Sequence, residues 1–130
     1  YYGFNSIASF YDYFVNTIIH ESIVDPLRTE FPNTTIFTIP TGWAAVNLLQ
    51  MKQDGLILDS INLSGPQATS LFTDAKGHQG DIIVEAGTLM WMKGIYQEDL
   101  GTNSYHTGFN TDLHGLADQI MSDHDPLYNQ

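Results

Sequence analysis

The sequence predicts a single α/β unit that is rich in helix, and three observations support this fold class. Apolar residues make up 42% of the 130 residues, which supplies enough core material to exclude a disordered chain. Helical periodicity recurs in several segments, and the β-branched and aromatic run at residues 34–39 is typical of a strand. Because the chain has the length of one domain and contains neither repeats nor linkers, we treat residues 1–130 as one unit.

Residues 6–30 predict a long helix. Ile7, Phe10, Phe14 and Ile18 recur at roughly helical spacing. Pro26 interrupts the pattern, because proline has no backbone N–H to donate. We therefore expect a bend near Asp25, either as a kink or as a second helix that begins with the proline.

A strand is expected at Thr34 to Ile39, between the turn signal at residues 31–33 and Pro40. A helix, a turn and a short strand together make half of an α/β repeat. Strands of this kind belong to a parallel sheet that is covered on both faces. This strand therefore needs neighbouring strands.

The remaining elements are three helices and one short strand. Apolar residues predict a helix at 43–51 that ends at Asp54-Gly55, and alternation at 56–63 indicates a short strand. Residues 81–96 are apolar nearly all round, so we expect that helix to be largely buried. Residues 113–121 predict an amphipathic helix.

Composition excludes several classes of function. A formal charge of −11, from 15 acidic and 4 basic residues, would repel nucleic acid and anionic membrane surfaces. The absence of cysteine removes disulfides, thiolate catalysis and cysteine-ligated zinc. No apolar run reaches the roughly 18 residues of a membrane span. The acidity is compatible with a secreted or periplasmic location but does not identify a compartment.

Asp74 and His78 are the candidate catalytic residues. They lie in one loop, Leu71 to His78, just before the apolar helix at 81–96. A carboxylate can hold one imidazole nitrogen as a donor and leave the other free to deprotonate a hydroxyl, as in a Ser-His-Asp triad. The position before a helix N-terminus would favour the neutral, basic form of His78.

These residues, in this order along the chain, resemble the C-terminal half of the SGNH (GDSL-like) hydrolases. The strand from Pro32 to Pro40, a helix ending in Gly55, Leu-Phe-Thr-Asp before the histidine, and then an apolar helix follow the family's order over roughly residues 10–100. The resemblance implies the C-terminal part of a three-layer α/β/α fold with a parallel sheet. It also implies that His78 is the general base and Asp74 its orienting partner.

The chain departs from the family in two ways. The spacing Asp74-x-x-x-His78 is one residue longer than the family's usual pattern, and Gly77 could absorb the extra residue with a positive φ. The family's first half, including its Gly-Asp-Ser block, is missing, so the chain looks like a piece. Gly3-Phe4-Asn5-Ser6 resembles the third block, whose Asn serves the oxyanion hole, but residues such as Asn5 and Ser6 more commonly cap a helix, here the first one.

Two functions remain open at this point. The first is an ester hydrolase, such as a carbohydrate acetylesterase, that acts on a small-molecule or carbohydrate ester and requires no cofactor. Its nucleophilic serine would come from a missing N-terminal half or a partner chain, so the isolated chain should be inactive. The second is a non-catalytic structural or interaction protein that keeps part of the fold, in which Asp74 and His78 are an ordinary surface pair.

Other polar and aromatic residues have simpler interpretations. His114 and Asp118 lie four apart and could hold a metal, but no further ligands stand at recognised spacing, so we expect a solvated polar face and no metal. Trp43 and Trp91 are expected in the core rather than as carbohydrate platforms. Glu85 is expected to find solvent or a partner at the edge of its helix.

Overall fold

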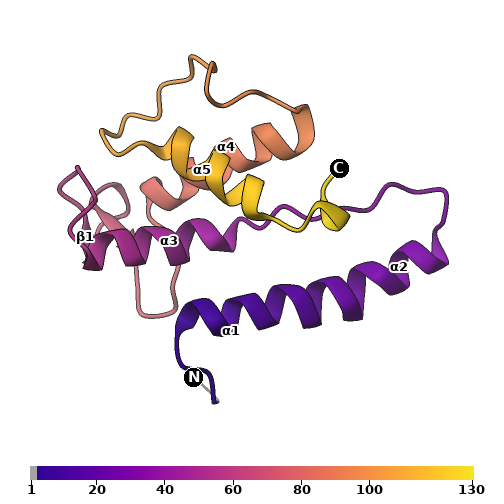
Figure 1. The fold of residues 1–130 in the computed structure, drawn as a ribbon. Coiled ribbons are helices and arrows are strands. Elements are labelled where there is room, and N and C mark those ends of the chain that lie inside the picture. Colours follow the sequence, from indigo (N-terminus) through magenta and orange to yellow (C-terminus); the bar gives the residue numbers. More distant parts are fainter. Residues whose placement is uncertain (1–2) are drawn as a thin grey trace.

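The computed structural model describes residues 3–130. A long helical rod, residues 7–30, runs beneath a cluster of three helices, and a small sheet lies at one end of that cluster (Figure 1). The structure is therefore mixed α/β with helix predominant, as predicted, and its sheet has two parallel strands. Within residues 3–130, no helix is long and apolar enough to cross a membrane.

The rod combines three helical segments: α1 (Ile7–Tyr13), the π-helix η1 (Phe14–Val24) and α2 (Asp25–Glu30). Ser6 caps it and forms a capping box with Ser9, so the capping interpretation of Ser6 is confirmed. The expected bend near Asp25 is wrong, because Asp25 keeps helical dihedrals and its N–H bonds to His20 O. In the π-helix η1, the backbone hydrogen bonds before Pro26 span five residues. Pro26 lies in the first turn of α2, and the rod continues past it without a sharp break (Figure 1).

The predicted strand at Thr34 to Ile39 is extended but is not a strand in the part of the chain that the structure describes. A strand requires a neighbouring backbone, and this segment receives only isolated bonds. The Thr38 N–H donates to Tyr128 O at 2.9 Å. The Arg28 guanidinium donates to Ile36 O from Nε at 2.9 Å and from Nη2 at 2.6 Å.

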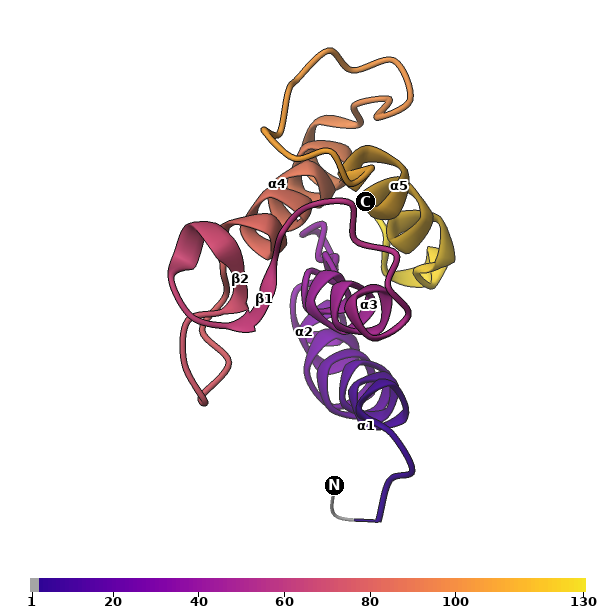
Figure 2. The ribbon, with the colours of Figure 1, turned by 90° about the vertical axis from the view of Figure 1, so that its left-hand side faces the viewer.

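Three elements lead from the extended segment to the sheet: α3 (Gly42–Gln53), β1 (Asn62–Ser64) and β2 (Ser70–Phe72), with a 3-10 turn η2 (Gln67–Thr69) between the strands. The predicted end of α3 is confirmed, since Gly55 has a φ of +69°. The strand expected within 56–63 forms only at its end, as β1. β1 and β2 pair in parallel beside the cluster of helices (Figure 2).

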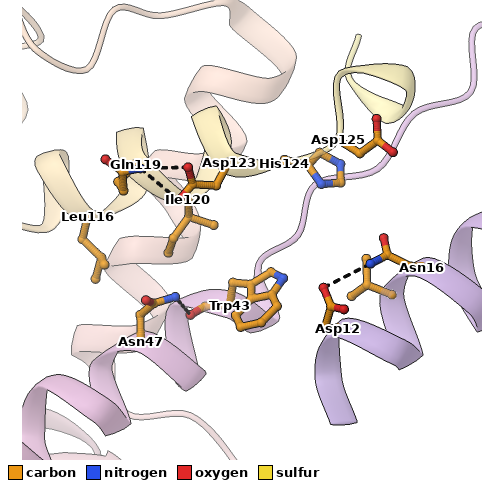
Figure 3. Close-up of a pocket in the computed structure, with 11 residues that line it drawn as sticks. Asp12, Asn16, Trp43, Asn47, Leu116, Gln119, Ile120, Asp123, His124 and Asp125 are labelled. Atoms are coloured by element: carbon orange, nitrogen blue, oxygen red, sulfur yellow. Dashed lines mark hydrogen bonds between the residues drawn. The ribbon is translucent and has the colours of Figure 1, made fainter. Parts of the chain in front are cut away.

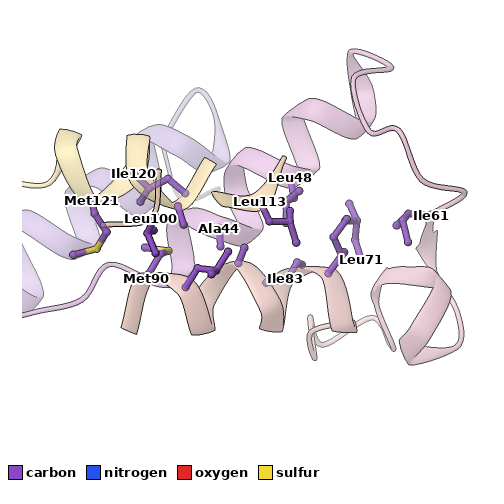
Figure 4. Packing of buried hydrophobic residues seen from close by; sticks show 14 residues of the cluster. Ala44, Leu48, Ile61, Leu71, Ile83, Met90, Leu100, Leu113, Ile120 and Met121 are labelled. Atoms are coloured by element: carbon purple, nitrogen blue, oxygen red, sulfur yellow. The ribbon is translucent and has the colours of Figure 1, made fainter. Parts of the chain in front are cut away.

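The last elements are α4 (Asp81–Tyr96), α5 (Leu113–Asp123) and a 3-10 turn η3 (Pro126–Tyr128). Side chains of α3, α4 and α5 meet in one core (Figure 4). Its fully buried members include Ala44, Leu48, Leu71, Ile82, Ile83, Ala86, Leu89, Met90, Leu113 and Ala117. The expectation that α4 is largely buried holds for one side only, because Val84 and Trp91 are exposed on the other.

Asp59 joins the loop before β1 to the loop before α5. Its carboxylate accepts hydrogen bonds from the backbone N–H and side chain of both Asn110 and Thr111, at 2.7 to 3.0 Å. Burial raises the pKa of Asp59, but these four hydrogen bonds outweigh it and hold the pKa below its usual value. The ionised carboxylate therefore stabilises the folded chain.

This arrangement predicts an acid-sensitive contribution to stability. A carboxyl group with a lowered folded pKa stabilises the protein above its unfolded pKa of about 3.9, and that stability is lost as the pH falls through the folded pKa. We expect Asp59→Asn to lower the free energy of unfolding at pH 7 by about 1–3 kcal/mol and to flatten its fall between about pH 5 and pH 3. Urea unfolding across that range measures both, with the exposed Asp54→Asn as control, and an unchanged pH slope would contradict the assignment.

Candidate functional site

The loop that carries Asp74 and His78 is a closed hairpin between β2 and α4. Phe72 forms an isolated antiparallel bridge with Gln79, and the Thr73 N–H donates to His78 O at 2.8 Å. At the base of the loop, the Gly80 N–H donates to Leu71 O at 2.7 Å. The loop therefore has a fixed path despite its exposure.

Asp74 and His78 are in direct contact. Asp74 Oδ2 lies 2.5 Å from His78 Nδ1, and Asp74 Oδ1 accepts the backbone N–H of Lys76 at 2.8 Å and of His78 at 3.3 Å. The hydrogen bond from the imidazole is the main cause that lowers the pKa of Asp74, and the two backbone N–H groups lower it further. The carboxylate is thus ionised at neutral pH and oriented by three donors.

Gly77 turns the chain between the acid and the histidine. Its φ is +85°, in the left-handed region that glycine adopts without penalty, and its N–H donates to Asp74 O at 3.3 Å. This turn brings residue 78 back beside residue 74. The role expected of Gly77 from the sequence is therefore seen in the structure.

The second imidazole nitrogen of His78 faces no hydrogen-bond partner among residues 3–130. The side chain of His78 is 71% exposed and that of Asp74 is 41% exposed. The pair can therefore take a proton from a group that approaches from outside the chain. Within the described residues, no serine hydroxyl is bonded to this imidazole.

The other residues singled out in the sequence lie away from this pair. Ile7 at the start of α1 lines an apolar pocket together with Phe72 at the base of the loop, but the side-chain hydrogen bonds of Asp74 and His78 stay within the loop and do not reach Asn5. His114 bonds to Leu100 O and Tyr105 O through its two ring nitrogens, and Asp118 pairs with Lys93. In residues 3–130 no group of three or more His, Cys, Asp or Glu side chains is placed to hold a metal.

The two tryptophans differ. Trp43 is partly buried and packs edge-on against Tyr11, with ring centroids 5.1 Å apart. The expectation that Trp91 is a core residue is wrong, because it is 54% exposed on the outer side of α4. Glu85 has a partner, as expected, since it accepts the Tyr105 hydroxyl at 2.9 Å.

No protein-family model, curated protein or solved structure matches this chain.

A cavity of about 510 Å³, which the sequence did not indicate, lies between the helical rod, α3 and α5 (Figure 3). Asp12 and Asn16 of the rod face Trp43 and His124 across it. The cavity does not include Asp74 or His78. Its walls come from segments about 30 to 110 residues apart, so no local sequence pattern could have identified it.

Proposed function

We propose that Asp74 and His78 are the acid and base of a serine-type ester hydrolase that resembles the SGNH hydrolases. The observation that carries the proposal is the contact of 2.5 Å between Asp74 Oδ2 and His78 Nδ1, with the second imidazole nitrogen open to solvent. A carboxylate at one nitrogen fixes the tautomer in which the other nitrogen is a base. His78 would be the catalytic residue and Asp74 would orient it.

The chemistry follows from this tautomer. His78 Nε2 accepts the proton of a serine hydroxyl as the serine oxygen bonds to the carbonyl carbon of the ester. The imidazolium, stabilised by ionised Asp74, then gives that proton to the leaving alcohol as its C–O bond breaks. Water attacks the acyl-serine in the same way, with His78 again as base, and releases the acid. The substrate would be a small-molecule or carbohydrate ester such as an acetyl ester.

The serine and the oxyanion hole would be supplied by sequence that is not in this chain. The extended segment at 34–39 supports this proposal, since its backbone has few partners within residues 3–130. In the complete three-layer α/β/α fold it would be a strand with a neighbour on each side. Those neighbours would pair with the free backbone of residues 34–39, and the same added sequence would have to supply the serine for His78.

A second candidate is a non-catalytic interaction protein, and the exposed apolar side chains favour it. Large hydrophobic residues that are more than half exposed include Leu56, Leu58, Leu63, Trp91, Tyr96 and Leu127. Where such side chains form one contiguous patch, they mark a surface that binds another chain. The two candidates differ in whether that other chain brings a nucleophile to His78.

Hydrolysis of p-nitrophenyl acetate separates the two candidates. We expect the 130-residue chain alone to release p-nitrophenolate at the rate of free imidazole, and the native assembly purified from its source to release it far faster. Adding the chain to the partner sequence should restore turnover. An assembly that is no more active than the isolated chain would favour the interaction protein and reject the hydrolase.

A further inference from the structure

A buried cluster fastens the helical rod to the C-terminal end of the chain. His20 of η1 is 1% exposed and His124, directly after α5, is 7% exposed. Their Nε2 atoms lie 3.0 and 2.9 Å from the same hydroxyl oxygen, Thr38 Oγ1. Tyr128 stacks on His20 with ring centroids 3.6 Å apart. Three segments distant in sequence, around His20, Thr38 and residues 124–128, therefore meet at one point.

The hydrogen bonds determine where the protons must be. The Thr38 hydroxyl has one hydrogen, so it can donate to at most one imidazole and must accept from the other. His20 Nδ1 is buried without a partner, and a bare nitrogen is better tolerated there than an N–H. The arrangement that fits is His20 Nε2–H donating to Thr38, and Thr38 donating to His124 Nε2. Both imidazoles are then neutral.

An added proton has no good place in this arrangement. A proton on His20 Nδ1 would be a buried donor without an acceptor. A proton on His124 Nε2 would point at the hydrogen of the Thr38 hydroxyl. The hydroxyl would then have to rotate, and its hydrogen would lose the imidazole nitrogen that accepts it. The two rings are only 5.4 Å apart, so a second charge would be repelled by the first.

The groups around His20 have opposite effects on its pKa. Burial is the largest effect and lowers the pKa of His20, Asp125 and Asp25 raise it, and Arg28 lowers it. Asp25 is engaged by the Tyr128 hydroxyl, at 3.1 Å to each carboxylate oxygen. Arg28 lies 5.0 Å from the centre of the Tyr128 ring. The result is a pKa below the usual value of histidine.

The surroundings of His124 also lower its pKa. Burial lowers the pKa of His124 most and the neighbouring His20 lowers it further, whereas Asp125 and the backbone carbonyl groups of Thr38 and Tyr128 raise it. The carboxylates of Asp12 and Asp123 line the adjacent cavity but are not bonded to the imidazole. An imidazole with a lowered pKa binds fewer protons in the folded chain, so acid favours the open form below about pH 6.5.

We propose that His20, Thr38 and His124 form a pH-sensitive latch that releases the helical rod from the C-terminal end of the chain in mild acid. Release would open the cavity of Figure 3, because Asp12, Val15 and Asn16 on the rod form one wall, and α3 and residues of the segment 116–125 form the rest. The latch is independent of Asp74 and His78. It would therefore operate whether or not the chain is part of an ester hydrolase.

Hydrogen exchange between pH 8 and pH 5, corrected for the intrinsic exchange rate, tests the latch on the 130-residue chain. Peptides covering residues 14–30 should lose protection by about tenfold per pH unit for each proton taken up, while peptides within 82–90 of α4 stay protected. His20→Gln and His124→Gln should flatten this dependence. His78→Gln, at an exposed position, should leave it unchanged. Equal loss in both regions, or no loss, would overturn the proposal.

The imidazole ¹⁵N chemical shifts of the unmodified chain give a second test that does not depend on the folding of a variant. At pH 7 both rings should be neutral, with the proton on Nε2 of His20 and on Nδ1 of His124. Below about pH 6.5 their protonation should coincide with the loss of protection of residues 14–30. Protonation of either ring while the rod stays protected would overturn the proposal.

Discussion

His78→Ala is expected to lower kcat for ester hydrolysis by the native assembly by about 1,000-fold or more. The substitution removes the only group that the proposal provides to deprotonate the serine. Asp74→Asn is expected to cost about 100-fold or more, because an amide can donate to Nδ1 and stabilise the wrong tautomer. Steady-state kinetics with p-nitrophenyl acetate measures both effects, and KM should change much less than kcat.

A matched control separates loss of the base from loss of a surface histidine. His106 is also exposed, and its Nδ1 accepts only the nearby Gly108 N–H at 3.1 Å. His106→Ala should therefore keep full activity. If His78→Ala and His106→Ala hydrolyse the ester equally fast, His78 is not the base.

Gly80→Ala is expected to destabilise the protein by about 3 kcal/mol and to displace the loop that carries Asp74 and His78. A Cβ at residue 80 would collide with the backbone carbonyl of Ser70 and would lie 3.0 Å from Gln67 O. These are backbone atoms at the join of β2 and η2, so they cannot rotate away. The collision would also break the Gly80 N–H bond to Leu71 O, which closes the base of the loop.

Gly87→Ala, seven residues further along the chain, is the matched control. A Cβ there would make an ordinary contact with Thr41 Cβ at 4.0 Å. Because alanine is the better helix former, this variant should be more stable by about 0.5–1 kcal/mol. Urea unfolding of both variants measures the difference, and equal stability of the two would contradict the packing described for Gly80.

The helices could be predicted from the sequence because their signals are local. The apolar pattern at 81–96 coincides with α4, and the pattern at 113–121 gives α5 within two residues. The prediction of a strand at Thr34 to Ile39 was wrong for the opposite reason, since strand pairing depends on a second backbone segment elsewhere in the chain. The prediction that Trp91 lies in the core was wrong. The apolar pattern shows that a helix is apolar but does not show whether another element packs against every side of it.

The same distinction applies to the candidate site. Asp74, Gly77 and His78 lie within five residues, so the contact between the acid and the histidine and the turn at Gly77 could be expected from the local sequence. The cluster of His20, Thr38 and His124 could not, because its members are 18 and 86 residues apart and meet only through the folding of the rod. Long-range contacts of this kind require the structure.

We propose that Asp74 and His78 activate a serine supplied from outside residues 1–130. Labelling of the native assembly with a fluorophosphonate, followed by mass spectrometry of its peptides, tests it most directly. The account predicts one labelled serine outside this sequence, and at least a 100-fold slower labelling when His78 is replaced by alanine. Labelling at an unchanged rate in His78→Ala, or no labelled serine at all, would contradict it.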